Sequence, residues 1–563
     1  MNEKLSLKNT FFIAICLSPR ADLPPPPLNR FKHNCLFSAI SIIGVKAMKK
    51  VLFLKNALIL TVTALLLRFV GIFFRVWLAA KIGAEGMGLY QVIFSVYVLA
   101  STFATSGICT AVTRMATERL AVRDKAGARR VLKISVLLST LIAGITSALI
   151  IGFARPISLY LICDARAEAS LKILCLSLPF MGICSCIKGY FLARRSTVPS
   201  SVSQMAEQLV RILVIVLLIG KFAHLGLSAA AAAVLAGDAA GEAAGALFIY
   251  LLYKLDIKKV SGTAEQSMRR RGALREMLRI AVPISAGRYL HTALRTVENL
   301  ITPTCFSRYT ASKSTALEQF GMIKGMALPL LMFPASLLSS VSTLLVPEMT
   351  EAMAKNDIRA IRAAVDKVFY ITALLSFLIT GIFFTASGQI GKAVYGSGSV
   401  GYLIRALSPL IPFMYIDLIA DGILKGLDQQ NILLRNNVAD SFVRIILVIL
   451  LVPRFGMNGF LGVMLFSNLF TSILSVIRIL RVTGVRFNAS VYFFKPLVAV
   501  FAASAVTDYL CRPLRGNCFL YIVAVACGVT ALYFMLMTLF GGIKSEYLLK
   551  KSLCIWRKRS KKV

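Results

Sequence analysis

The chain has 563 residues, of which 57% are hydrophobic and only 16% are charged. Disordered chains are poor in apolar residues and are excluded, and ordinary soluble domains, at roughly 45–50% apolar and roughly 25% charged, are disfavoured. The net charge of +39 is typical of nucleic-acid binders, but such an interface needs a basic face on a soluble domain, and the long apolar segments leave little room for one. The composition predicts an all-α, polytopic membrane protein with basic loops and no nucleic-acid partner.

Residues 1–47 differ from the rest of the chain. The apolar run at 11–17 is too short to span a bilayer, and the four prolines at 24–27 stop a helix. A cleaved signal peptide is one interpretation, but no small-residue cleavage site clearly follows the apolar run. We interpret residues 1–47 as an N-terminal extension produced by a mis-assigned start, with Met48 as the true first residue.

Long apolar segments follow from there to the C-terminal tail. A bilayer core needs about 20 mostly apolar residues per helix. An even number of spans places both termini on one side, and the excess of Lys and Arg in the loops on that side, with the tail at 542–563, assigns it to the cytoplasm. We expect fourteen spans, at residues 56–80, 88–112, 132–153, 170–193, 202–221, 226–253, 278–303, 319–346, 368–388, 403–425, 433–452, 457–480, 493–511 and 517–540.

Two parts of the sequence resemble each other at an offset of 233 residues, since AEQLVRIL at 206–213 aligns with ADSFVRII at 439–446. Chance similarity between apolar helices is the alternative, and the matched charged positions disfavour it. In transporters built from such repeats the substrate site lies between the halves. We expect an extension at 1–47, a six-helix bundle at 48–255, a basic cytoplasmic linker at 256–274, a second six-helix bundle at 275–485, two extra helices at 486–541 and a basic cytoplasmic tail at 542–563.

Arginines inside two predicted spans are the main candidate functional residues, because a charge at the bilayer centre costs roughly 2.5–3.5 kcal/mol on insertion scales. Arg68 and Arg75 are seven residues apart and share one face of the first span. Arg288 and Arg295 repeat this spacing in the seventh span. If both helices line the cleft between the halves, four guanidinium groups face the cavity, and they predict an anionic ligand, best a phosphate or pyrophosphate.

His291 and Glu298 lie on the same stripe as Arg295 and are expected to be supporting polar residues of the cavity. A structural interpretation of the stripes remains open. Arg295 would then pair with Glu298 of its own helix. Arg68 would extend to the membrane interface if its helix begins later than expected.

Acidic residues occur in two further spans. Asp238 and Glu242 either pair with an arginine of a neighbouring helix or bind a coupling cation, Na⁺ or H⁺. They alternate with glycines whose four-residue spacing lets helices approach closely, at Gly237, Gly241 and Gly245.

Asp417 and Asp421 share a helix face with Lys425, and this face either reaches the cavity or lies at its cytoplasmic mouth. Like Asp238 and Glu242, these two acids are candidates for cation coupling or for helix pairing. Two further pairs at equivalent places in the repeat are expected to be structural i,i+4 pairs: Glu207 with Arg211, and Asp440 with Arg444.

Signatures of catalysis and of cofactor binding are missing from the sequence. There is no GxxxxGK[ST] phosphate loop and no CxxC pair, and the GSGSVG segment at 396–401 lacks a strand–helix context. We expect no catalytic residue, no metal and no cofactor, and therefore a transporter that uses an ion gradient or the membrane potential, or that works downhill.

The segments GIFFR at 71–75 and GAEGMGLYQ at 83–91 resemble the stage V sporulation protein B group of polysaccharide-biosynthesis flippases, within the multidrug/oligosaccharidyl-lipid/polysaccharide (MOP) exporter superfamily. The resemblance covers about residues 48–545. It implies a fourteen-helix fold with two bundles around a central cavity. One departure is that Ile108 follows Gly107, where the resemblance implies a proline.

The resemblance also implies a function. It implies that an undecaprenyl-linked oligosaccharide such as lipid II moves from the inner to the outer leaflet of the bacterial cytoplasmic membrane, with its pyrophosphate held by Arg68 and Arg75. We expect a monomer with membrane lipid around it.

Two other functions are alternatives to lipid-linked oligosaccharide transport. A MATE-type cation-coupled drug antiporter needs acidic residues in the cavity, whereas the candidate cavity helices are chiefly basic. A membrane enzyme of cell-wall glycans needs a spaced cluster of carboxylates or histidines, and Glu85, Asp164 and Glu168 on the predicted outer side do not form one.

Overall fold

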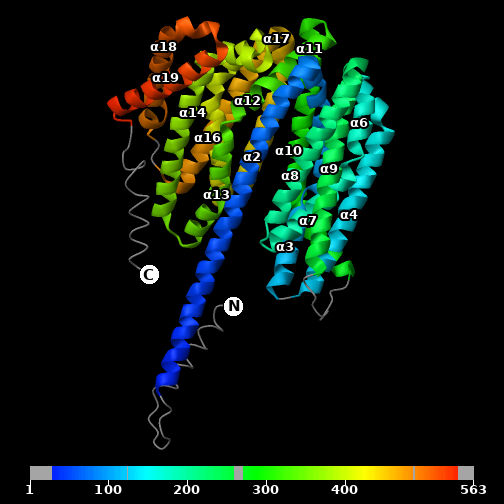
Figure 1. Cartoon of the computed structure of the whole chain (residues 1–563), viewed down its shortest axis with the longest axis vertical. Coiled ribbons are helices and arrows are strands. Elements are labelled where there is room, and N and C mark those ends of the chain that lie inside the picture. Colours follow the sequence, from blue (N-terminus) through cyan, green and yellow to red (C-terminus); the bar gives the residue numbers. More distant parts are fainter. Residues whose placement is uncertain (1–27, 123, 259–269, 486–487, 543–563) are drawn as a thin grey trace, which may run out of the picture. The chain divides into compact units, whose positions relative to one another are not determined.

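The computed structural model describes residues 28–122, 124–258, 270–485 and 488–542, and the regular structure in these ranges is entirely helical (Figure 1). The chain divides into two units, residues 1–58 and residues 59–563. In the first unit the described residues are helical from Leu28 onward. The tail at 543–563, the extension up to residue 27 and most of the linker predicted at 256–274 lie outside the described residues.

Two of the helices each contain two of the predicted spans. α2 (Leu28–Thr105) turns at Gly83, where φ is 72° and ψ is −179°, and α17 (Gln430–Thr483) turns at Gly456, where φ is 54° and ψ is −130°. Glycine reaches these positive φ values without the steric cost that a Cβ would add. The spans are therefore joined by a sharp turn rather than by a loop.

The second span ends in a break at Gly107, after which α3 (Ile108–Ala121) begins. The bend therefore forms without the proline that the family resemblance implies. The remaining principal helices are α4 (Lys125–Gly152), α6 (Ala167–Cys175), α7 (Leu178–Ala193), α8 (Val198–Phe222), α9 (Leu227–Lys258), α10 (Arg270–Thr310), α11 (Lys313–Phe320), α12 (Leu328–Met332), α13 (Ala335–Ala354), α14 (Ile358–Tyr395), α15 (Gly398–Leu407), α16 (Ile411–Gly426), α18 (Lys495–Cys511) and α19 (Cys518–Leu539).

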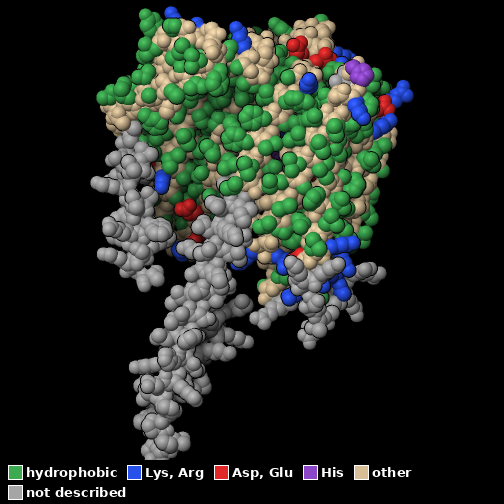
Figure 2. All heavy atoms as spheres, viewed as in Figure 1, with side chains coloured by type: hydrophobic (Ala, Val, Ile, Leu, Met, Phe, Trp, Pro, Cys, Tyr) green, Lys and Arg blue, Asp and Glu red, His purple; other side chains and the backbone are tan. Residues whose placement is uncertain are grey.

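The described helices agree with the predicted multi-span fold. Ten are long and apolar enough to cross a membrane, and the pair Lys313–Met332 and Ala335–Ala354, bent by 65°, adds an eleventh. Two of the ten contain the turns at Gly83 and Gly456 and so carry two spans each. α10, which contains the seventh predicted span, is not among these helices. Hydrophobic side chains cover the sides of the helices, with Lys and Arg gathered at their ends (Figure 2).

α10 connects the two halves expected from the repeat. Its Ser285 hydroxyl donates to the carbonyl of Ser106 at 2.8 Å, and its Thr296 hydroxyl donates to the carbonyl of Ser95 at 3.1 Å. On another side it packs along α17. The first span makes a comparable contact with the other half, since the rings of Phe69 and Phe333 lie 4.8 Å apart. The first and seventh spans therefore both lie where the halves meet.

The second span crosses the α11–η3 segment at very close range, where η3 is the π-helical segment Gly321–Ala327. A Cβ on Gly88 would lie 2.0 Å from the carbonyl oxygen of Leu317, and a Cβ on Gly321 would lie 1.9 Å from the carbonyl oxygen of Ala84. The two backbones are therefore in contact, and only glycine fits at these positions. The crossing joins the halves on the predicted outer side.

Polar contacts surround this crossing. The Ser314 hydroxyl donates to Glu85 Oε2 at 2.7 Å, and Arg166 Nη2 lies 2.8 Å from Glu85 Oε1. Arg166 also binds Asp164 at 2.7 Å. The hydrogen bond to Asp164, together with that to Glu85, raises the pKa of Arg166 above its ordinary value, since both favour the charged guanidinium. Of the three outer-side carboxylates, Glu85 therefore takes part in this crossing, whereas Asp164 pairs locally with Arg166 and Glu168 pairs with Lys172 of its own helix.

Candidate functional site

Arg68 and Arg75 lie together in one pocket, as their seven-residue spacing predicts. The pocket has a volume of 310 Å³ and lies between the first span and the segment that joins α12 to α13, where Phe333 and Ser336 line it. Arg68 is exposed and Arg75 is half-buried. Within the described part of the chain neither guanidinium has an ion-pair or hydrogen-bond partner. Two free cations therefore face one cavity between the halves.

Arg288 and Arg295 are both exposed on α10, and among the described residues neither forms an ion pair. They do not line the pocket that holds Arg68 and Arg75, so the structure does not bring the four arginines into one site. Arg295 lies within electrostatic range of Arg444 and Asp417, and His291 lies near Arg295. The part of the stripe at His291 and Arg295 therefore lies on the side of α10 that packs along α17.

Glu298 is buried and does not pair with Arg295 of its own helix. Its Oε1 instead lies 3.3 Å from Lys324 Nζ on η3 and 3.5 Å from Arg444 Nη1 on α17. Arg444 in turn lies 3.3 Å from Asp440 and donates through Nε to the Ser467 hydroxyl at 2.9 Å. Glu298 thus ties three helices together, and Arg295 has no ion-pair partner among the residues that the structure describes.

A corresponding network lies in the first half, where α8 and α9 meet. Arg211 is 2.9 Å from Glu207, 3.2 Å from Asp238 and 3.6 Å from Glu242. The Tyr90 hydroxyl donates to Asp238 at 3.2 Å. The predicted glycine stripe allows this approach, because a Cβ on Gly241 would lie 2.9 Å from Arg211 Cβ.

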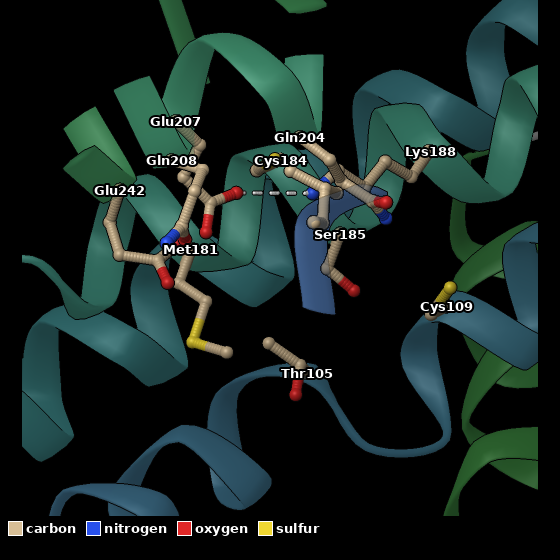
Figure 3. A pocket seen from close by; sticks show the side chains of 11 residues that line it. Thr105, Cys109, Met181, Cys184, Ser185, Lys188, Gln204, Glu207, Gln208 and Glu242 are labelled. Carbon is tan, nitrogen blue, oxygen red and sulfur yellow. Dashed lines mark ion pairs between the residues drawn. The ribbon is translucent and has the colours of Figure 1, made fainter. Parts of the chain in front are cut away.

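The network opens into a pocket of 420 Å³ (Figure 3). Lys188 lies 3.6 Å from Glu207 at one side of it, the ion pair drawn in Figure 3. Glu242 projects from the opposite side, and its nearest described cation is Arg211. This network therefore joins three carboxylates and two cations of the described residues, with Glu242 the most weakly paired of the acids. The wall of the pocket is completed by Leu67, Thr105, Cys109, Met181, Cys184, Ser185, Gln204 and Gln208.

Asp417 and Asp421 have separate partners. Asp417 accepts a hydrogen bond from the Ser475 hydroxyl at 3.1 Å, which ties α16 to α17. Asp421 pairs with Lys425 one turn later on the exposed face of α16. Asp417 therefore belongs to the helix interface, whereas Asp421 lies on an exposed face.

Sequence reasoning did not single out four residues that the structure places in these networks. Lys188 and Lys324 are ionisable residues inside predicted spans, so the rule that selected the arginines would have found them. Tyr90 and Ser467 have no comparable signal, because hydroxyl side chains are common in membrane helices. Their roles depend on contacts between residues far apart in the chain.

Residues 53–353, more than half of the chain, match the family described as "Polysaccharide biosynthesis protein". The chain is 23% identical over 510 residues to stage V sporulation protein B of Bacillus subtilis (strain 168), covering 89% of this chain and 98% of the relative. It is 22% identical over 443 residues to the lipid II flippase MurJ of the same organism, covering 72% of this chain and 78% of the relative.

Solved structures share the fold. The lipid II flippase MurJ in an inward closed conformation superposes with a TM-score of 0.64 at 14% identity, over 85% of this chain and 98% of that one. An inward-facing multidrug resistance MATE family transporter of the MOP superfamily gives a TM-score of 0.59 at 14% identity, over 75% and 99%. These proteins are transporters by name, in agreement with the prediction of a transporter rather than an enzyme. The chain therefore belongs to the polysaccharide biosynthesis protein family, as a multi-pass membrane protein with the MOP transporter fold.

Proposed function

We propose that this protein moves an undecaprenyl-pyrophosphate-linked oligosaccharide, such as a peptidoglycan precursor, from the inner to the outer leaflet of the bacterial cytoplasmic membrane. The observation that carries the proposal is the pocket between the halves, in which Arg68 and Arg75 have no described partner. Guanidinium groups bind phosphate oxygens through paired N–H donors and remain charged at any physiological pH. The lipid II flippase among the relatives supports the substrate class.

The contrast with the other intramembrane arginines strengthens this assignment. Arg211 and Arg444 are each surrounded by carboxylates of neighbouring helices. An unpaired charge within a membrane protein is costly. Carboxylates neutralise Arg211 and Arg444, whereas no described residue pairs with Arg68 or Arg75, and this difference supports a ligand-binding role for the second pair. Arg288 and Arg295, which likewise form no ion pair with any described residue, would receive the anion as the halves move.

The arrangement of the halves supports alternating access. The crossing of Gly88 and Gly321 closes the predicted outer side by backbone contact. A headgroup would therefore enter from the cytoplasmic side, with the polyprenyl chain remaining in lipid, and would leave outward when this crossing opens. In this proposal both termini are cytoplasmic and the protein works as a monomer.

We further propose that an ion gradient supplies the energy; the sequence contains no nucleotide-binding loop, and the membrane potential and downhill transfer are the alternatives. We propose Glu242 as the residue that takes up H⁺ or Na⁺, because it lines the pocket of the first half and is 3.6 Å from Arg211. Asp238 is held by both Arg211 and Tyr90, and Asp417 by Ser475. Asp421 faces outward beside Lys425 and is the weakest candidate.

A MATE-type drug antiporter is the second candidate function, and the pocket lined by Glu207 and Glu242 favours it, since a cationic drug needs carboxylates. One experiment separates the two. Cells depleted of the protein are assayed for lipid-linked oligosaccharide protected in the inner leaflet and for ethidium efflux. Accumulation of one precursor with unchanged efflux supports the flippase, whereas a loss of efflux without accumulation supports the antiporter.

A further inference from the structure

An apolar groove of 750 Å³ lies on the first half, between α4, α7 and α9, and shares no lining residue with the pockets described above. Its walls include Leu137 of α4, Phe180 of α7 and Leu247 of α9, all of which are exposed. A volume of this size is within the range of about 300–1,000 Å³ that is typical of ligand sites. Apolar side chains exposed along a membrane helix are in contact with lipid.

Two cations stand at one end of this groove. Lys133 and Lys254 both line it, both are exposed, and among the described residues neither has an ion-pair partner. Lys254 Nζ lies 5.0 Å from the centre of the Tyr250 ring, which orients the ammonium group over the groove. The rest of the lining is almost entirely apolar, so the site is amphipathic, with its charge confined to one end.

The charged end lies at the predicted cytoplasmic ends of the helices. Lys133 is two turns from the start of α4 at Lys125, and Lys254 is one turn from the end of α9 at Lys258. At a rise of 1.5 Å per residue, the stretch of lining from Ala243 to Lys254 extends roughly 16 Å along α9. This is about half of the roughly 30 Å bilayer core, which is the depth of one leaflet.

We propose that this groove binds an anionic phospholipid of the inner leaflet, with its phosphate at Lys133 and Lys254 and an acyl chain along Leu137 and Leu247. The positive charge of the two lysines favours an anionic headgroup over a neutral one. Basic pockets between membrane helices on the cytoplasmic side bind anionic lipid headgroups in the same way. The bound lipid fills the space between α4 and α9 beside α7, apart from the transport pathway.

The test is lipid retention by the full-length protein in nanodiscs of phosphatidylcholine with a minor fraction of phosphatidylglycerol, measured by native mass spectrometry after release into detergent. The wild type should retain phosphatidylglycerol in preference to phosphatidylcholine. Lys133→Gln and Lys254→Gln should each weaken retention about fivefold, at about 1 kcal/mol per lysine. Lys125→Gln, an exposed lysine on the same side but outside the groove, is the matched control and should leave retention unchanged.

A second pair of variants tests the apolar part and does not alter charge. Leu137→Trp should fill the groove and reduce retention, whereas Leu149→Trp, at an exposed site on α4 outside the groove, should not. The proposal would be overturned if the double variant Lys133→Gln and Lys254→Gln retained phosphatidylglycerol as well as the wild type does. It would also be overturned if the wild type retained phosphatidylglycerol and phosphatidylcholine equally. Unchanged lipid-linked oligosaccharide flipping in the lysine variants would leave the proposed transport function intact, so the two proposals fail separately.

Discussion

Lys324 Nζ lies 3.3 Å from Glu298 Oε1, and this ion pair joins the π-helical segment η3 to α10 across 26 residues of sequence. Both side chains are largely buried, and Arg444 approaches the same carboxylate oxygen at 3.5 Å. A buried carboxylate held by two cations fixes the seventh and eighth spans relative to the eleventh.

Replacing Glu298 by Gln should therefore destabilise the fold, because it leaves Lys324 and Arg444 buried without their shared anion. Removing one partner of a buried pair costs about 3–5 kcal/mol, and the free energy of unfolding in detergent should fall by about that amount. Lys324→Met added to Glu298→Gln should recover part of the loss. The exposed pair of Glu351 with Lys355 is the matched control, and Glu351→Gln should change stability by less than about 1 kcal/mol. An equal effect of the two Gln substitutions would remove the structural role of Glu298.

Gly88→Ala should open the predicted outer side, since its Cβ would lie 2.0 Å from the carbonyl oxygen of Leu317. The measurement is labelling of Ala316→Cys, at a buried position of α11 beside the crossing, by a membrane-impermeant maleimide added from outside, in a background whose native cysteines are replaced. Labelling should rise severalfold when Gly88→Ala is added. Gly144→Ala, on α4, has no atom within 4 Å of the new Cβ and should leave labelling unchanged. Equal labelling with and without Gly88→Ala would show that the crossing does not close this side.

Glu242→Gln should leave the protein folded, since Arg211 keeps Glu207 at 2.9 Å and Asp238 at 3.2 Å. If Glu242 takes up the coupling cation, flipping in proteoliposomes should lose its dependence on an imposed pH or Na⁺ gradient. Asp421→Asn, at an exposed acid already paired with Lys425, is the comparison and should keep the dependence. Retention of the wild-type gradient dependence by Glu242→Gln would exclude this residue as the coupling site.

Much of the fold can be predicted from the sequence because apolar length is a local property. The spans were predicted from composition, and the shared face of Arg68 and Arg75 follows from helical periodicity. The glycine stripe of α9 likewise predicted close packing, which the position of Gly241 against Arg211 confirms. Local sequence did not indicate that turns at Gly83 and Gly456 would replace loops.

The partners of the buried charges could not be predicted in the same way. An i,i+3 spacing made Arg295 a natural partner for Glu298, but the carboxylate is buried and binds Lys324 and Arg444 from two other helices. Which cation pairs with Glu298 depends on packing between segments far apart in the chain. The groove with Lys133 and Lys254 was missed for the same reason, since three separate helices form it.

The most direct test of the central claim is transbilayer movement of a fluorescent undecaprenyl-pyrophosphate-linked sugar in proteoliposomes that contain the purified full-length protein. We predict that the wild type accelerates movement, and that the double variant Arg68→Ala and Arg75→Ala lowers the rate at least about tenfold, since charge-assisted contacts to the pyrophosphate are lost. Arg155→Ala, at an exposed arginine outside the pocket, should keep the wild-type rate and controls for loss of positive charge. A wild-type rate in the folded double variant would contradict the assignment of these two arginines to the substrate.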